Sequence, residues 1–409
     1  MKNLLSVVIF FSLSIFVQLS AQDITVEMQK FPFSDVAEWP EHGLILFAKD
    51  PAKNTFQQEL SFVNQKGELI WQEHYLPSVE NPSMITSGES DYIYFLDQIK
   101  PDAEGKIYFN QVSISGYVKK GSIFFPPLFR ALENVDFTNS KLINIINANS
   151  DLIFHFREMD KKNNMYKDVL IFFNHTMLKA YPVLAPGVYL FSEIENNSKS
   201  LLQYVGSKRG DNYFANYTTK NKQKGYDLVT YSEKGELKAT PFMNAPKEKV
   251  TSIKLASNQL NGAYYLNEDQ PAVLGQLLYY KDAFYLAGGN ETGGVSVWKY
   301  TDGNPTLLVK DLAVAHKKST EYAIGVSFLD NRFIVFAKSD QTTQSSVFDL
   351  SGKPLTTGGD YDKDYERNPS QLFFAKKPLN FVIKLGDAVY EINKQNWSTT
   401  DKSAIFKRQ

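Results

Sequence analysis

The sequence contains no cysteine and only five histidines among its 409 residues. Without cysteine the chain can form neither a disulfide nor a thiolate metal site, and no lipid can be attached to it through a lipobox. A protein of this size that is exported without disulfides is typical of a bacterial envelope. The histidines, which show no metal-ligand spacing, are His42, His74, His155, His175 and His316. We expect each to be a singly satisfied core or surface residue, and we expect no metal and no cofactor.

An excess of positive charge is also missing. Removal of residues 1–21 would take away one lysine and leave 43 basic against 45 acidic side chains. No basic block stands out in the remaining chain. Nucleic acids and anionic membrane surfaces are therefore not expected as partners.

Only one long apolar run is present, and it lies at the N-terminus. Leu4–Leu19 follows Lys2, and Leu19-Ser20-Ala21 provides small residues for cleavage before Gln22. A membrane-spanning helix needs about 20 mostly apolar residues, so this shorter run indicates a signal peptide. We expect cleavage of residues 1–21, no transmembrane segment in the mature chain, and a periplasmic or secreted location.

A hairpin pattern recurs along the rest of the chain: an apolar run reaches a glycine or asparagine corner, and a second run returns. Examples are Ser61–Tyr75, Leu228–Phe242, Val295–Leu308 and Ser345–Thr357. The corners are expected at Gly67, Gly121, Asn174-His175, Gly235, Gly303, Gly352 and Asn393-Lys394-Gln395. The apolar strands ahead of them are Leu44–Ala48, Tyr92–Leu96, Leu152–Phe156, Leu201–Val205, Ala283–Ala287, Arg332–Ala337 and Asn380–Leu385.

The repeat predicts an all-β fold, a single β-propeller of seven four-stranded blades over residues 22–409. One four-stranded sheet would leave both apolar faces in water, whereas sheets stacked around an axis cover every face. The ring needs a closing device, and Ile24–Met28 alternates apolar and polar residues. We predict that this segment pairs with the last blade, Asn380–Trp397, as its outer strand.

Two stretches depart from the repeat. Ser207–Lys224 is long and polar inside the fourth unit, and Met243–Pro271 lies between the fourth and fifth corners. Loops added to a rigid ring often carry binding surfaces, but a surface loop can also lengthen at little cost without a role. Both alternatives stay open for these two segments.

One acidic run is a candidate for a calcium-binding loop. In Asp360–Glu366, carboxylates at every second position resemble the start of a calcium loop. The pattern then fails, because Tyr365 stands where the loop needs glycine and Gln371 where it needs glutamate. An exposed acidic loop is expected instead of a metal site.

Signals for catalysis are missing as well. The run Val63–Trp71 is the closest to a sialidase-type Asp-box, but Gln65 replaces the aspartate. No Gly-x-Ser-x-Gly elbow occurs, and the glycines at 288–294 precede a strand and not the helix that a phosphate loop requires. We predict no catalytic residue and favour a protein that is not an enzyme.

Aromatic residues make up 14% of the chain, and most are expected to fill the space between blades. Those flanked by polar residues are candidates for a sugar- or protein-binding surface: Tyr213, Phe214, Tyr217, Tyr361 and Tyr365.

A blade that turns on Gly67 and returns to Trp71 resembles those of the broad superfamily of bacterial exported β-propellers. The resemblance implies the fold but transfers no functional residue, because only the first unit has its tryptophan in place. The expected function is a non-catalytic, protein-binding or scaffold propeller of the cell envelope, with another envelope protein as partner. The alternative is a carbohydrate-binding or polysaccharide-degrading propeller with its site at the axial opening.

Overall fold

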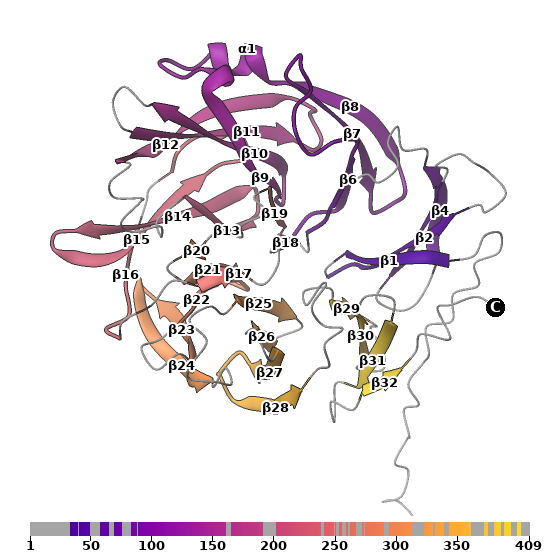
Figure 1. The fold of residues 1–409 in the computed structure, drawn as a ribbon, viewed down its shortest axis with the longest axis vertical. Helices are drawn as coiled ribbons and strands as arrows, with labels where there is room; N and C mark the ends of the chain where they lie inside the picture. Colours follow the sequence, from indigo (N-terminus) through magenta and orange to yellow (C-terminus); the bar gives the residue numbers. More distant parts are fainter. Residues whose placement is uncertain are drawn as a thin grey trace, which may run out of the picture.

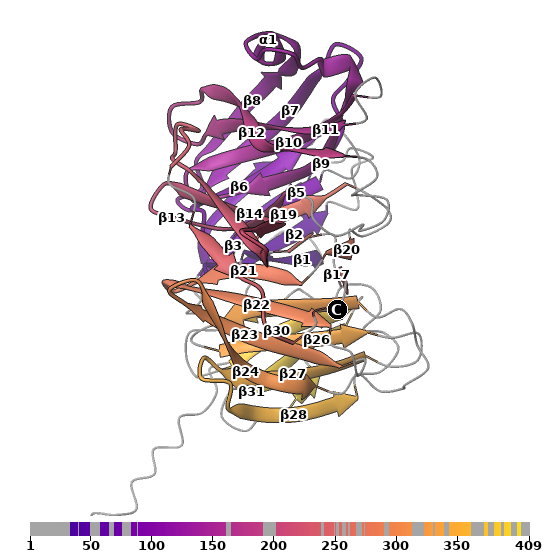
Figure 2. The same cartoon turned by 90° about the vertical axis from the view of Figure 1, so that its left-hand side faces the viewer.

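Antiparallel sheets follow one another along the chain in the computed structural model, and Figure 1 shows them arranged around a common centre. Figure 2 shows the same sheets from the side, stacked face to face. The structure describes residues 33–39, 41–49, 58–64, 69–75, 83–87, 89–160, 165–190, 202–238, 241–248, 250, 253–255, 259–260, 262–266, 272–273, 275–289, 294–312, 323–329, 332–338, 343–360, 372–374, 380–385, 388–393 and 399–401.

Seven sheets are formed by these residues, and five of them have four strands in chain order. Sheet 1 contains β1 (Phe33–Trp39), β2 (Gly43–Lys49), β3 (Gln58–Asn64) and β4 (Leu69–Tyr75). Sheet 2 contains β5 (Ser83–Ile85), β6 (Tyr92–Leu96), β7 (Lys106–Ser113) and β8 (Val118–Phe124). Sheet 4 contains β13 (Gln203–Lys208), β14 (Asp211–Lys220), β15 (Gln223–Tyr231) and β16 (Phe242–Asn244). Sheet 5 contains β21 (Gln276–Tyr280), β22 (Ala283–Gly289), β23 (Val295–Thr301) and β24 (Asn304–Leu312). Sheet 7 contains β29 (Leu372–Phe374), β30 (Asn380–Leu385), β31 (Ala388–Asn393) and β32 (Thr399–Asp401).

The other two sheets have six strands, because each gains a pair from the segment between sheets 4 and 5. Sheet 3 contains β9 (Ser140–Asn147), β10 (Asp151–Asp160), β11 (Met165–Asn174) and β12 (Ala180–Leu190), with β18 (Gln259–Leu260) and β19 (Ala263–Tyr265) added next to β9. Sheet 6 contains β25 (Ala323–Leu329), β26 (Arg332–Lys338), β27 (Thr343–Asp349) and β28 (Pro354–Asp360), with β17 (Ile253–Leu255) and β20 (Ala272–Val273) added next to β25.

The apolar core lies between neighbouring sheets. Five clusters of buried side chains join sheets 1 and 2, 2 and 3, 3 and 4, 4 and 5, and 5 and 6 in the described part of the chain. Between sheets 2 and 3, the Phe125 ring meets Phe154 and Phe156 edge-on, with centroids 5.2 and 4.8 Å apart. Such aromatic pairs add to the burial that stabilises stacked sheets. The architecture is that of a β-propeller, as the sequence predicts.

The segment between sheets 4 and 5 enters the centre of the ring. In Figure 1, β17, β18, β19 and β20 lie on the inner side of the sheets to which they pair. β19 pairs antiparallel with β9, and β17 pairs parallel with β25. The departure predicted at Met243–Pro271 is therefore confirmed as an insertion, and its described strands extend the inner edges of sheets 3 and 6.

One expectation for sheet 2 is wrong. The corner expected at Gly121 lies inside β8, and the turn falls at Gly116, which has a φ of 84°. Gly121 is needed for space, because a Cβ there would lie 2.7 Å from the ring of Phe109. A short helix, α1 (Phe125–Arg130), was also not expected; two prolines open it, which is a favourable way to start a helix. A single 3-10 turn, η1 (Phe137–Asn139), follows.

The polar stretch Ser207–Lys224 is not a loop. It contains β14 and the start of β15, which form a hairpin. Asn212, Phe214 and Asn216 are buried on one face, while Tyr213 and Tyr217 on the other face are half-buried. Because asparagines occupy inward positions, the period-2 pattern of the strand is hidden from a reading based on hydrophobicity.

The segment predicted to close the ring, Ile24–Met28, lies outside the described residues, as do residues 1–21. The outer position next to β31 is held by β32, and β29 lies beside β1 and β2 (Figure 1). Within the described chain, no helix is long and apolar enough to cross a membrane.

Candidate functional site

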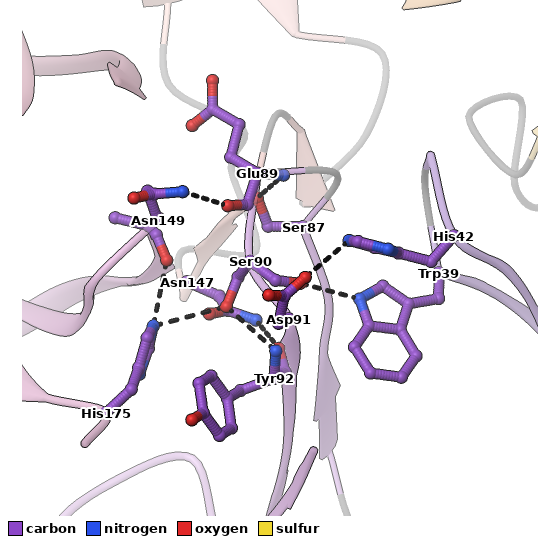
Figure 3. Close-up of polar contacts among 11 residues, drawn as sticks. Trp39, His42, Ser87, Glu89, Ser90, Asp91, Tyr92, Asn147, Asn149 and His175 are labelled. Atoms are coloured by element: carbon purple, nitrogen blue, oxygen red, sulfur yellow. Dashed lines mark hydrogen bonds and ion pairs between the residues drawn. The ribbon is translucent and has the colours of Figure 1, made fainter. Parts of the chain in front are cut away.

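Two inner loops and the end of a strand meet on one side of the ring. They are the β5–β6 loop, the β9–β10 loop and the end of β13, and they come from sheets 2, 3 and 4. Asn149 connects them: its side-chain nitrogen donates to the Glu89 carbonyl at 2.7 Å, and its backbone N–H donates to Ser207 Oγ at 2.8 Å. Figure 3 shows the first of these bonds within the polar cluster around Glu89.

Glu89 is held by one of its two carboxylate oxygens. Oε2 accepts hydrogen bonds from Ser207 Oγ (2.6 Å), the Ser207 backbone N–H (2.8 Å) and the Tyr204 hydroxyl (3.1 Å). In the described chain, Oε1 accepts no hydrogen bond. Burial raises the pKa of Glu89 to about 7, although the bonds from Ser207 and Tyr204 act in the opposite direction. The side chain is half-buried, and in Figure 3 it points away from the rest of the cluster.

Gly206 provides the space beside the free oxygen. A Cβ at this position would lie 3.2 Å from Glu89 Oε1 and 3.0 Å from Tyr279 Cβ. Its φ of 152° is also one that residues with a side chain rarely adopt. Glycine therefore brings the edge of sheet 5 close to the carboxylate of Glu89.

Three half-buried aromatic rings lie next to Gly206. Tyr213 is the cross-strand partner of Gly206, and its ring centroid is 4.8 Å from that of Tyr279 and 5.5 Å from that of Phe284. Tyr279 and Phe284 are 5.0 Å apart. We call Glu89, Gly206, Tyr213, Tyr279 and Phe284 the Glu89 cluster; it combines an acidic oxygen with aromatic faces.

An ion pair borders the Glu89 cluster. Lys208, at the end of β13, pairs with Asp282 in the turn between β21 and β22. The Tyr279 hydroxyl donates to the same carboxylate at 3.0 Å. Lys208, which follows Ser207 in the sequence, is therefore paired with Asp282.

His175 connects sheets 2 and 3 through hydrogen bonds. Its Nδ1 is 2.6 Å from the Tyr94 hydroxyl, and its Nε2 is 3.0 Å from the Ala148 carbonyl. Ser90 Oγ lies 3.3 Å from the same Nε2 (Figure 3). Burial lowers the pKa of His175 to about 4, so the ring is neutral at pH 7. A neutral imidazole with hydrogen on Nε2 satisfies these contacts.

Sheet 1 contacts the β5–β6 loop through Trp39, whose Nε1 donates to the Ser90 carbonyl at 3.0 Å. His42 Nε2 lies 3.9 Å from Asp91 Oδ1, and burial lowers the pKa of His42. Both contacts appear in Figure 3. His42, His155 and His175 contact different partners, namely Asp91, Asp168 and Tyr94.

A second buried acid lies in sheet 3. Asp151 is 0% exposed, and its Oδ2 accepts from the Asn212 side chain at 3.1 Å. Burial raises the pKa of Asp151 to about 7, against the hydrogen bonds from Asn212 and Asn174. Asp151 thus belongs to the contact between sheets 3 and 4.

The aromatic candidates from the sequence have different positions. Tyr213 belongs to the Glu89 cluster, whereas Phe214 is fully buried and Tyr217 packs against Tyr226 at 5.6 Å. Tyr361 and Tyr365 lie outside the described residues, together with most of the acidic run 360–366. No group of three or more acidic or histidine side chains that could hold a metal occurs in the described ranges.

Sequence reasoning missed Glu89. Its signal is a loop of small residues, Ser87-Gly88-Glu89-Ser90, between two apolar strands with a single acid inside. Its partners, Tyr204 and Ser207, are 115 and 118 residues away along the chain, so only the fold brings them together.

Comparison with known proteins shows a distant likeness to peptidases. No family model and no curated protein matches the chain. Among solved structures, a prolyl endopeptidase is 12% identical over 91% of this chain and 49% of its own, with a TM-score of 0.49. The β-propeller domain of the Trilobed protease from Pyrococcus furiosus is 12% identical, with 81% and 97% covered and a TM-score of 0.33. The acylaminoacyl peptidase of Pyrococcus horikoshii is 11% identical, with 91% and 58% covered and a TM-score of 0.35.

These neighbours contradict the predicted function. They are peptidases or parts of peptidases, and the non-catalytic envelope scaffold expected from the sequence is overturned, together with its carbohydrate alternative. The chain spans about half the length of the prolyl endopeptidase that it matches. The sequence could not reveal this likeness, because a propeller repeat indicates the fold and not the site built on it.

Proposed function

We propose that this chain is the propeller of a peptidase-related protein, and that it binds extended peptide along the inner edges of its sheets. The observation that carries the proposal is the chain's own insertion, whose strands add to two inner edges. Addition of a strand to a sheet edge is a general way to bind peptides, because backbone hydrogen bonds do not depend on sequence.

The inner edges accept extended chain in both directions. On sheet 3, Ala263 lies opposite Ile146, and the Asn147 N–H donates to the Gly262 carbonyl at 2.8 Å. The Leu266 N–H donates to the Ile143 carbonyl at 3.0 Å. On sheet 6, β17 runs parallel to β25. Among the described strands, β1, β5, β13, β21 and β29 have no strand added on the inner side. Of these, β13 contains Ser207 and β21 contains Tyr279, next to Glu89.

The first test uses a fluorescein-labelled octapeptide with the sequence of residues 259–266, which contains β19, the strand that pairs with β9. We expect saturable binding to the full chain by fluorescence anisotropy. A control peptide with prolines at the second and sixth positions lacks two N–H donors, and we expect it to bind about tenfold more weakly. Equal affinity of the two peptides would show that backbone pairing does not drive binding.

We also propose that the seven sheets are the seven blades of one ring in an exported protein whose signal peptide is residues 1–21. The support is the face-to-face packing of consecutive sheets and the N-terminal apolar run. If residues 22–30 carry the closing strand, their deletion will lower the melting temperature by several degrees, because the ends of the ring lose a shared sheet. An unchanged thermal unfolding curve would contradict this closure.

A further inference from the structure

We infer that the Glu89 cluster binds a primary ammonium group of a ligand, between the free oxygen of Glu89 and the rings of Tyr213, Tyr279 and Phe284. This inference rests on the proposed peptide-binding function and deepens it, since peptides present such groups at the amino terminus and on lysine.

The carboxylate is oriented before any ligand arrives. Three donors from Ser207 and Tyr204 all bind Oε2, so the side chain cannot rotate without losing them. Oε1 accepts none of these bonds, and it lies beside Gly206 and the Cβ of Tyr279. An ammonium group forms a short, charge-assisted hydrogen bond to such an oxygen, and a fixed acceptor loses little conformational entropy on binding.

The aromatic faces suit a cation and not an anion. Tyr213 and Tyr279 flank Gly206, and Phe284 packs against both rings. The face of an aromatic ring is electronegative and attracts ammonium groups, most strongly where water is partly excluded. The three rings are half-buried, so they remain open to solvent on one side.

The charged groups described near Glu89 do not neutralise its carboxylate, so it is available to pair with a cation. The titratable and charged groups on the elements packed against it are Asp151, Tyr204, Lys208, Arg209, Asp211, Tyr213, Tyr279 and Asp282. Lys208 pairs with Asp282, and Arg209 is exposed in the turn after it. Asp211 pairs with Lys238. The carboxylate of Glu89 is thus without a cationic partner in this part of the chain.

Binding is linked to a proton. Burial raises the pKa of Glu89 to about 7, so the empty site is largely protonated at pH 6 and ionised at pH 8. An ammonium group pairs with the ionised form, so its affinity rises with pH across this range and the site releases a proton on binding.

The experiment is calorimetric titration of the full chain with three small probes. N-acetyl-lysine amide carries a side-chain ammonium, norleucine amide carries an α-ammonium, and N-acetyl-norleucine amide is the neutral isostere. We expect saturable heat at pH 7.5 for one or both amines and none for the isostere, and the stronger amine identifies the natural source. For N-acetyl-lysine amide we expect affinity to fall about tenfold at pH 6, as the site protonates. Equal heats for the amines and the isostere would overturn the inference.

Variants assign the effect to this cluster. Glu89→Gln keeps the size of the side chain and removes the charge, and we expect it to abolish binding. The matched control is Glu104→Gln, an exposed glutamate that pairs with Lys106 on sheet 2, and it is expected to bind like the wild type. Melting curves show whether Glu89→Gln is folded. If it is not, Tyr279→Leu provides the second test, with affinity lowered about threefold through loss of one ring. Unchanged binding in either folded variant would overturn the site.

The two proposals can fail separately. Binding of an amine without binding of the labelled octapeptide would leave the Glu89 site intact and reject peptide binding at the inner edges. Binding of the octapeptide with no response to any amine would support peptide binding at the inner edges and reject the Glu89 site.

Discussion

Replacement of Asp168 by alanine is expected to lower the free energy of unfolding by about 3–5 kcal/mol, because it leaves the mostly buried guanidinium of Arg157 without its counter-charge. Asp168 is 1% exposed and lies between sheets 3 and 4. Its Oδ1 accepts from Arg157 Nε at 2.9 Å and lies 3.0 Å from His155 Nε2. Burial alone would raise the pKa of Asp168, but Arg157 and His155 outweigh it and hold the pKa below its usual value.

Urea unfolding at pH 7 measures this loss. The control is Glu236→Ala, an exposed acid on the turn after β15, for which we expect a change within about 0.5 kcal/mol. The double variant Asp168→Leu, Arg157→Leu removes both charges, and we expect it to be more stable than Asp168→Ala. A loss below about 1 kcal/mol in Asp168→Ala would show that this ion pair is not a structural element.

Replacement of Asp151 by asparagine is expected to remove a large pH dependence of stability. Burial raises the pKa of Asp151 to about 7 in the folded protein, above its ordinary value of 3.8. The folded state therefore holds the proton more tightly than the unfolded state, and the stability of the wild type falls as pH rises from about 4 to about 7. A shift of this size corresponds to about 4 kcal/mol.

Asparagine cannot ionise, so the stability of the variant relative to the wild type increases as the pH rises from about 4 to about 7. We expect the difference in unfolding free energy between the two proteins to change by about 4 kcal/mol from pH 4 to pH 7.5, in favour of the variant. Glu89 also contributes to the pH dependence of stability, but its contribution is the same in both proteins and cancels in their difference. Asp302→Asn, which changes an exposed turn residue, is the control. A difference that stays constant with pH would contradict the buried, protonated state of Asp151.

Much of the fold could be predicted from the order of apolar strands. Tyr92–Leu96 coincides with β6, and Leu152–Phe156 lies within β10, because both are dense in branched and aromatic residues. The corners at Gly235, Gly303 and Gly352 are also found, each with a positive φ. At these positions, the local sequence and the fold require the same conformation.

The errors occur where a residue serves a distant partner. Gly121 looks like a turn residue but makes room for Phe109 on the neighbouring strand. Asn212 looks like a loop residue but reaches Asp151 in the next sheet, 61 residues earlier in the chain. Glu89 depends on partners two sheets away. The partners of Asn212 and Glu89 are 61 or more residues away, so no short window of sequence contains both members of these pairs.

The insertion between sheets 4 and 5 has a mechanical consequence. Its first and last strands, β17 and β20, belong to sheet 6, whereas β18 and β19 between them belong to sheet 3, so the insertion links these two sheets across the centre of the ring. This link restrains the movement of sheets 3 to 6 relative to one another. The ring can widen with least cost where β29 lies beside β1 and β2, and slow opening of this protein is expected to begin at that seam.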